Sequence, residues 1–390
     1  TCDKLNPSSC AHNTATIEVV GSPIIAVNDS ASGINGLVGA TAVVNAFTGD
    51  RINGVAASTT NAVLAVSATS SVPSQLTFNP ATGNVDVNAG TPAGTYSFDY
   101  DICEKLNPTN CKTATISVTV VAAAITADTD TATGINGASG ASNVANVLDG
   151  DTLNSVAATT STVDITVITP ATPASPGAPI PALNTATGQI SVPAGTPAGN
   201  YAIEYEICDK INPLNCASNT ATIEVVGAPI VATDDGATGI NGMTGATAVV
   251  NAFTADTVNG AAASAVNAVL SVAPTSSVPS QLTFNPATGN VDVNPASPAG
   301  TYSFDYQICE KLNPANCKVA TISVTVVAAA IAADADSVTG INGATGANNV
   351  VDVLDGDTLN GAPATTSLVD IAVTTPAHQL ALALRCQRST

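Results

Sequence analysis

The stretch "TYSFDYDICEKLNPTNCKTATISVTVV", residues 95–121, decides the fold. Apolar and polar residues alternate along it up to Cys103 and alternate again after Cys111. This period of two is the pattern of a β-strand that buries one face. The two strands therefore predict an antiparallel hairpin with a cysteine at each end of its loop. The predicted core-facing positions are Tyr96, Phe98, Tyr100, Ile102, Ala114, Ile116, Val118 and Val120.

The hairpin loop "CEKLNPTNC" occurs in four versions along the chain. The others are "CDKLNPSSC" from Cys2, "CDKINPLNC" from Cys208 and "CEKLNPANC" from Cys309, at steps of 101, 105 and 101 residues. The segment "VPSQLTFNPATGNVDVN" occurs at 72–88 and again, unchanged, at 278–294. Self-similarity at a fixed period indicates an array of modules. Two kinds of module alternate, and each is long enough, at about 100 residues, to bury its own core.

The repeat fixes the expected domain boundaries. Residues 1–21 are predicted to be the last hairpin of a preceding module, which makes the chain a piece of something longer. We expect complete modules at 22–121, 122–227 and 228–327, and a truncated one at 328–390. The linkers "VVGSP" and "VVAAA" are only a few residues long and are not flexible Gly/Ser tethers. Neighbouring modules are therefore expected to touch and to form an elongated rod.

Each module is predicted to be an all-β sandwich. The chain is rich in β-branched residues and in turns with Gly, Pro and Asn, and only 3% of its residues are aromatic. In the first module we expect strands at 23–27, 41–47 and 61–67, with Gly-rich connectors between them. Four more strands, "QLTF", "NVDVN" and the hairpin pair, complete the seven of an immunoglobulin-like sandwich. A tyrosine after "PAG" predicts the tyrosine corner of such folds at Tyr96, Tyr201 and Tyr302.

Eight of the nine cysteines form four pairs of identical spacing. Zinc sites use shorter cysteine spacings and often histidine, and the chain has only two histidines. We therefore predict disulfides within each hairpin, which indicates an exported, extracellular protein. The predicted pairs are Cys2–Cys10, Cys103–Cys111, Cys208–Cys216 and Cys309–Cys317.

Two segments resemble known repeat families. "LTFNPATGNVDVNAGTPAGTYSF" (76–98) resembles the immunoglobulin-like repeats of large bacterial surface proteins. "ITADTDTATGINGASGASNVANVLDGDTLNSV" (125–156) resembles the cadherin-like and bacterial Ig-like repeats of giant adhesins. The resemblance extends over every module, and it implies a tandem Ig-like fold and a location at the cell surface.

Charge and motifs exclude several classes of function. Nine Lys and Arg against 29 Asp and Glu give a net charge of −20, which argues against nucleic acid or an anionic membrane as a partner. No run of 18 apolar residues predicts a membrane span. The chain carries no nucleophile elbow, metalloprotease motif or phosphate loop, so we expect no enzyme.

The acidic residues gather at expected loop positions near one pole of each module. Their mutual repulsion needs a counter-charge, and Ca²⁺ binds six to eight oxygens from such loops. The sequence thus predicts calcium where a module faces its predecessor. The alternative is a solvated acidic end that Lys105, Lys210 and Lys311 partly balance. The candidate ligands are Asp128, Asp130, Asp149, Asp151, Asp209, Asp234, Asp235, Asp256, Asp334, Asp336, Asp355 and Asp357; the first module is poorer in acids.

We interpret the chain as the structural shaft of a bacterial surface adhesin or extracellular filament. The alternative is an adhesive binding module that recognises a glycan or another cell surface. A ligand site of that kind would place aromatic or basic residues on exposed loops, whereas the tyrosines here fall on predicted core positions. The expected partners are neighbouring repeats or copies of the same chain, and the sequence names no external ligand.

The tail "HQLALALRCQRST", residues 378–390, leaves the repeat abruptly. With suitable codons, its gene read in a shifted frame encodes a segment similar to "PASPGAPIPALN" (173–184) of the second module. We therefore predict a frameshifted reading of the next repeat strand. Cys386, the odd ninth cysteine, then has no partner.

Overall fold

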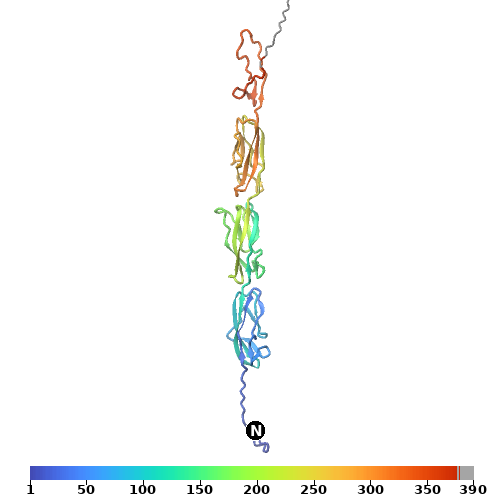
Figure 1. The fold of residues 1–390 in the computed structure, drawn as a ribbon, viewed down its shortest axis with the longest axis vertical. Helices are drawn as coiled ribbons and strands as arrows, with labels where there is room; N and C mark the ends of the chain where they lie inside the picture. Colours follow the sequence, from blue (N-terminus) through green and yellow to red (C-terminus); the bar gives the residue numbers. More distant parts are fainter. Residues whose placement is uncertain (376, 378–390) are drawn as a thin grey trace, which may run out of the picture. The chain divides into compact units, whose positions relative to one another are not determined.

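The computed structural model describes residues 1–375 and 377, which form strands, turns and no helix. None of these residues therefore lies in a helix of the length and apolarity needed to cross a bilayer. The chain divides into two compact units, residues 1–226 and 227–390. In Figure 1 the first three modules are separate bundles of strands, with the first in blue and the second in green. The tail prediction and Cys386 lie outside the described residues.

The first module, module 1, contains ten strands in three sheets. The main pair of sheets has the orders β2-β10-β9-β6 and β3-β8-β7, and a small third sheet has the order β1-β4-β5. The strands are β1 (Ile24–Ile25), β2 (Asp29–Asn35), β3 (Ala40–Asn45), β4 (Arg51–Ile52), β5 (Val55–Ala56), β6 (Ala62–Val66), β7 (Leu76–Phe78), β8 (Asn84–Val87), β9 (Gly94–Glu104) and β10 (Asn107–Val121). The seven strands of the main sheets form the predicted sandwich.

Modules 2 and 3 repeat this plan. Module 2 has the sheets β12-β20-β19-β16, β13-β18-β17 and β11-β14-β15, and module 3 has β22-β30-β29-β26, β23-β28-β27 and β21-β24-β25. The strands of module 2 are β11 (Ile125–Thr126), β12 (Asp130–Asn136), β13 (Ala141–Asn146), β14 (Thr152–Leu153), β15 (Val156–Ala157), β16 (Val163–Thr169), β17 (Ala182–Asn184), β18 (Gln189–Val192), β19 (Gly199–Asp209) and β20 (Cys216–Val226). Those of module 3 are β21 (Ile230–Val231), β22 (Asp235–Asn241), β23 (Ala246–Asn251), β24 (Thr257–Val258), β25 (Ala261–Ala262), β26 (Ala268–Val272), β27 (Leu282–Phe284), β28 (Asn290–Val293), β29 (Gly300–Glu310) and β30 (Cys317–Val327). The prediction of a tandem all-β array of Ig-like sandwiches is confirmed.

The hairpin β9–β10 carries the core of module 1, as its alternation predicts. Its antiparallel register pairs Tyr100 with Ala114 and Phe98 with Ile116. Seven of the eight predicted core positions are buried, and Tyr96 is half-buried. The core cluster adds Leu64 from β6 and Leu76 from β7. Both sheets therefore contribute to one apolar interior.

The first strand of the module differs from the prediction at 23–27. Only Ile24 and Ile25 are extended there, and they pair with β4 in the small sheet. The edge strand of the main sheet is β2, which runs parallel to β10 through a segment expected to be a connector. The register of β2 shifts around Gly33, which has φ +75°. A glycine at this angle forms a bulge within a strand, which explains why the sequence looked like a loop.

Module 4 has fewer strands among its described residues than the other modules. Its described residues form β31 (Ile331–Ala332), β32 (Thr358–Leu359) and β33 (Ala362–Pro363), which make only the small sheet. These described residues include no counterpart of the β9–β10 hairpin, which supplies the backbone partners of β2 and β6 in module 1. Apolar residues that would face that hairpin, such as Val338 and Ile341, are exposed.

Candidate functional site

The structure joins the cysteines of each hairpin loop in a disulfide. In modules 1 to 3 the bonded cysteines occupy facing positions of the two hairpin strands. The disulfide therefore closes the loop at its base and fixes where both strands end. The pairs are Cys2–Cys10, Cys103–Cys111, Cys208–Cys216 and Cys309–Cys317.

Inside the loop of module 1, one carboxylate binds several donors. Glu104 Oε1 accepts a hydrogen bond from Ser22 Oγ (2.6 Å), and Oε2 accepts from the Ser22 amide (2.9 Å). Asn107 and Asn110 each donate to Oε2 at 3.0 Å. These bonds, that of the Ser22 hydroxyl first, lower the pKa of Glu104 to about 2. The acid thus organises the loop and joins it to the start of the module.

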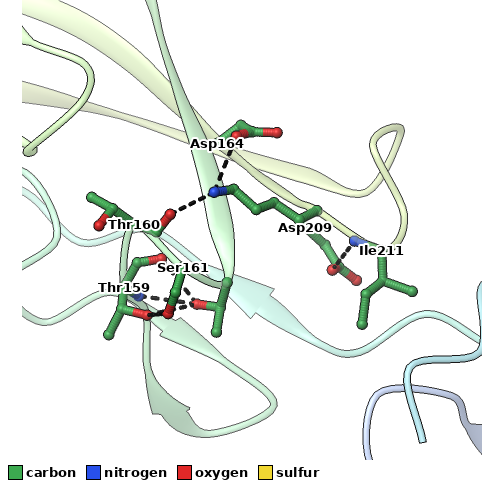
Figure 2. A network of polar contacts seen from close by, with 8 residues as sticks. Thr159, Thr160, Ser161, Asp164, Asp209 and Ile211 are labelled. Atoms are coloured by element: carbon green, nitrogen blue, oxygen red, sulfur yellow. Dashed lines mark hydrogen bonds and ion pairs between the residues drawn. The ribbon is translucent and has the colours of Figure 1, made fainter.

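Asp209 holds the same position in module 2 and does not belong to an acidic cluster. Its carboxylate accepts from the Ile211 amide (2.9 Å) and from Asn212 Nδ2 (2.8 Å) and is fully buried. Figure 2 shows Asp209 turned into its own loop. Since its oxygens are used within the loop, the prediction that it joins Asp128 and Asp151 as a calcium ligand has no support in this geometry.

The lysine of the loop also differs from the expectation. Lys210 Nζ donates to the Thr160 carbonyl (2.5 Å) and lies 3.6 Å from Asp164. Thr160 lies in the turn before β16, so this bond joins the hairpin loop to that turn. Lys105 and Lys311 bind the equivalent carbonyls of Thr59 and Ala265. The lysines therefore tie the hairpin loop to a neighbouring turn.

The three predicted corner tyrosines bind the backbone just before their own strands. The hydroxyls of Tyr96, Tyr201 and Tyr302 donate to the carbonyls of Pro92, Pro197 and Pro298, at 2.8–2.9 Å. A tyrosine corner is defined by this bond to a carbonyl a few residues upstream.

A second tyrosine of β9 binds two buried aspartates. Tyr100 Oη lies 3.0 Å from Asp29 Oδ2 and 2.9 Å from Asp50 Oδ2. Asp50 Oδ1 accepts from the Val27 amide at 2.7 Å. Burial raises the pKa of Asp29 to about 6, against the lowering effect of the Tyr100 bond, and also raises that of Asp50. Desolvation favours the neutral form of each acid.

Module 3 has the same arrangement. Tyr306 Oη lies 3.1 Å from Asp235 Oδ2 and 2.9 Å from Asp256 Oδ2, and burial raises the pKa of Asp235 to about 6. The third candidate ligand, Asp234, accepts from the Thr321 amide at 2.8 Å. Backbone amides therefore donate to Asp234 and Asp256, and the Tyr306 hydroxyl lies between Asp235 and Asp256.

Module 2 departs from this arrangement at one oxygen. Tyr205 donates to Asp130 Oδ2 (2.9 Å), and Asp151 Oδ1 accepts from the Asp128 amide (2.6 Å). Asp151 is fully buried, yet its Oδ2 has no hydrogen-bond partner. Burial, with the nearby carboxylates Asp128 and Asp149 among the smaller contributions, raises the pKa of Asp130 and of Asp151 to about 6. Asp128, Asp130 and Asp149 are therefore near enough to Asp151 to disfavour its charged form, and one of the buried oxygens of Asp151 is unpaired.

Module 4 has the four acids in the same sequence positions. The Asp334 amide donates to Asp357 Oδ1 at 2.7 Å, as Asp128 does to Asp151. The pKa of Asp336 is raised by partial desolvation and then by neighbouring carboxylates, including Asp357 and Asp355. No tyrosine lies beside these acids among the described residues of module 4.

A compact group of metal-ligating residue types among the described residues consists of Glu206, Cys208 and Cys216. Because the two cysteines form a disulfide, they offer no thiolate to a metal. The sequence pattern did not predict the Asp–Tyr–Asp contacts, although the hydroxyl of a buried tyrosine usually finds a hydrogen-bond partner.

Comparison with known proteins finds no matching family model and no matching curated protein. Solved cadherin ectodomains show distant likeness. A Drosophila N-cadherin EC1-3 structure matches with TM-score 0.33 and 11% identity, covering 78% of this chain and 100% of its own. The human desmocollin-1 ectodomain matches with TM-score 0.30 and 9% identity, covering 82% of this chain and 64% of its own. Mouse cadherin-23 EC22-24 matches with TM-score 0.29 and 10% identity, covering 78% of this chain and 96% of its own. At these scores the likeness is too distant to argue from.

Proposed function

We propose that the chain is part of the shaft of an exported protein, a bacterial surface adhesin or an extracellular filament. The observation that carries the proposal is the repetition of one disulfide-closed sandwich through linkers of a few residues. Four disulfides indicate an oxidising, extracellular location. In such a protein the modules act as spacers, and their partners are neighbouring modules or copies of the chain.

The alternative, a module that itself binds a glycan or a cell surface, has less support. All twelve aromatic side chains lie among the described residues, and each is buried or half-buried. Protein sites for sugars and peptides usually place aromatic side chains at the surface. We propose neither a catalytic role nor a nucleic-acid partner for these modules.

For modules 2 and 4 we propose a divalent cation, with Ca²⁺ as the best fit to carboxylate oxygens. The support is the unpaired, fully buried Oδ2 of Asp151 beside Asp128, Asp130 and Asp149. The corresponding residues of module 4 are Asp334, Asp336, Asp355 and Asp357. The known contacts of these acids are all within their own modules, so the ion would stabilise a module rather than bridge two.

Small-angle scattering of the chain tests the shaft. We expect the maximum dimension to grow in proportion to the number of modules when chains of one, two and three modules are compared. A maximum dimension that stays near that of one module would exclude a shaft. A glycan array with the same protein tests the alternative, and specific binding at micromolar concentration would favour it.

A further inference from the structure

Modules 1 and 2 are joined by a short linker and a direct contact between two asparagines. β10 ends at Val121 and β11 begins at Ile125, so residues 122–124 are the whole linker. Asn35 Nδ2, at the end of β2, donates to Asn154 Oδ1 of module 2 at 2.6 Å. Asn35 Oδ1 accepts from the Leu37 amide at 2.9 Å, so its side chain is held at both ends.

Two further contacts act at other points of the same junction. The Leu37 side chain packs against the core cluster of module 2. The Ala93 amide, from the loop before β9, donates to Asn212 Oδ1 in the hairpin loop of module 2 at 2.5 Å. The linker, the asparagine pair and the Ala93 bond are separate in sequence and lie on different elements. Contacts at several separate points restrict both tilt and rotation between two bodies.

The second unit repeats the junction between modules 3 and 4. Asn241 Nδ2 donates to Asn360 Oδ1 at 2.7 Å, and Asn241 Oδ1 accepts from the Met243 amide at 3.0 Å. Asn360 Oδ1 also accepts from the Ala330 amide in the linker (3.1 Å), and Asn360 Nδ2 approaches Met243 Sδ at 3.7 Å. The same pair of asparagines therefore occurs twice, and in each pair the two residues are 119 positions apart in the sequence.

The apolar side chain at the junction follows the two-module period. "GING" is followed by Leu37 in module 1 and Met243 in module 3, but by Ala138 in module 2 and Ala344 in module 4. A leucine or methionine can bury several more methylene groups at the junction than an alanine, and burial of apolar surface favours the contact. This larger side chain is therefore a property of the odd-numbered modules alone.

We propose that this asparagine clasp and apolar plug hold module 1 rigidly to module 2, and module 3 to module 4, without a bound ion. This inference deepens the proposed shaft, since it names what stiffens it. The contacts described above use amides and apolar groups and involve no carboxylate.

Native-state hydrogen exchange of the full chain in EDTA, read by mass spectrometry, tests the clasp. In Asn154→Ala the Leu37 amide of the neighbouring module should exchange roughly tenfold faster, because Asn35 loses the partner that orders it. In Asn35→Ala the amide of Asn154, which binds the Ala124 carbonyl, should exchange faster by a similar factor. Coupling between two sites is reciprocal, so both effects are required.

Asn53→Ala is the matched control. Asn53 occupies the equivalent turn of module 1 with φ 51°, against 56° for Asn154, but it is exposed and has no side-chain hydrogen bond among the described residues. It therefore measures the cost of alanine in this turn alone and should leave the Leu37 amide unchanged. Equal exchange at Leu37 in Asn154→Ala and Asn53→Ala, or an unchanged Asn154 amide in Asn35→Ala, would overturn the clasp. Either result leaves the proposed shaft, tested by scattering, untouched.

Discussion

Two equivalent glutamates differ in how completely their oxygens are paired. Both oxygens of Glu104 have donors, and the Ser22 hydroxyl serves Oε1. In module 3 the same place in the sequence is Ala228, and Glu310 Oε1 is buried without a partner. A buried acceptor that lacks a donor loses the free energy of its former hydration. One hydroxyl therefore separates a satisfied site from an unsatisfied one.

Ala228→Ser should stabilise module 3. The new hydroxyl can donate to Glu310 Oε1, as Ser22 does to Glu104, and should raise the free energy of unfolding by about 1 kcal/mol. Pulsed hydrogen exchange after equilibration in urea reads each module separately. Ser22→Ala is the mirror change and should weaken module 1. An Ala228→Ser variant that is less stable than the wild type would show that the pocket has no room for the hydroxyl.

The Asp–Tyr–Asp contact of module 1 should make its stability fall as pH rises. The pKa of Asp29 is about 6 in the folded state, above its ordinary 3.8, so the folded module binds the proton more tightly than the unfolded chain. This stabilisation is complete below about pH 4 and is lost as pH rises through about 6. Asp50→Asn should abolish the dependence, because the amide can donate permanently to the Tyr100 oxygen.

The same pulsed exchange, after equilibration in urea at pH 4 to 7, measures this effect. Asp101→Asn, on the outer face of β9, is the control and should keep the wild-type dependence in that range. At lower pH, Glu104 has the opposite effect on the stability of module 1, which it lowers as pH falls. Its pKa of about 2 is below the ordinary 4.5, so its stabilisation is lost as pH falls from about 4.5 toward 2. A wild-type module 1 that gains stability from pH 4 to 7 contradicts the burial of these aspartates.

At the scale of the element, the hairpin carries more contacts than its two strands need. Its loop holds Glu104, its lysine binds the turn before β6, and its strands flank the core. A loop of this length has many conformations in the unfolded chain. The disulfide removes much of that entropy before folding begins.

Opening the disulfide of module 1 should therefore destabilise the whole module. For a ring of this length the loop-closure entropy corresponds to about 2–3 kcal/mol. We expect Cys103→Ser/Cys111→Ser to lower the urea midpoint of module 1 accordingly. Cys2→Ser/Cys10→Ser is the control, since that pair lies outside the strands of module 1. Equal stability of the two double variants would mean that the loop is held by its hydrogen bonds alone.

The turn before β24 contains a strained residue. Ala255 has φ 59°, whereas its counterparts in the other modules are Gly49, Gly150 and Gly356. The left-handed region costs an L-residue roughly 1–2 kcal/mol, which is partly offset by the lower entropy of unfolded alanine. Ala255→Gly should thus stabilise module 3 by about 0.5–1 kcal/mol in the same urea experiment.

Gly49→Ala is the reverse test and should destabilise module 1 by a similar amount. A Cβ at Gly49 would meet only the Val27 side chain, at 3.6 Å or more, which is an ordinary contact. The substitution therefore reports the backbone angle rather than a clash. The left-handed turn would be contradicted if alanine were the more stabilising residue at both positions, that is, at 49 in module 1 and at 255 in module 3.

At the scale of the whole molecule, stability and stiffness should respond differently to calcium. The proposed ion lies within modules 2 and 4, whereas the contacts between modules are amides and apolar groups. We expect Ca²⁺ to raise the unfolding temperature of module 2 and to leave the scattering profile unchanged. Asp151→Asn should remove the thermal effect, and Asp50→Asn in module 1 should not. A profile that changes on chelation would place the ion at a junction.

The sequence alone determined the repeated sandwich, the hairpin and the cysteine pairs. These features depend on local periodicity and on a repeat that shows its own boundaries, and both are visible in a single chain. The sequence did not predict the edge strand β2, because Gly33 and the short polar residues around it are typical of a connector. Only its parallel pairing with β10 makes it a strand.

The environment of each acid was decided by the tertiary structure. The sequence grouped Asp209 with Asp128 and Asp151, but the fold turns Asp209 into its own loop and gives Asp50 a tyrosine from a distant strand. Charge and spacing along the chain do not say which carboxylate is buried or what donor it meets. Those properties arise when strands far apart in sequence pack together, and they set the pKa and the binding capacity of each group.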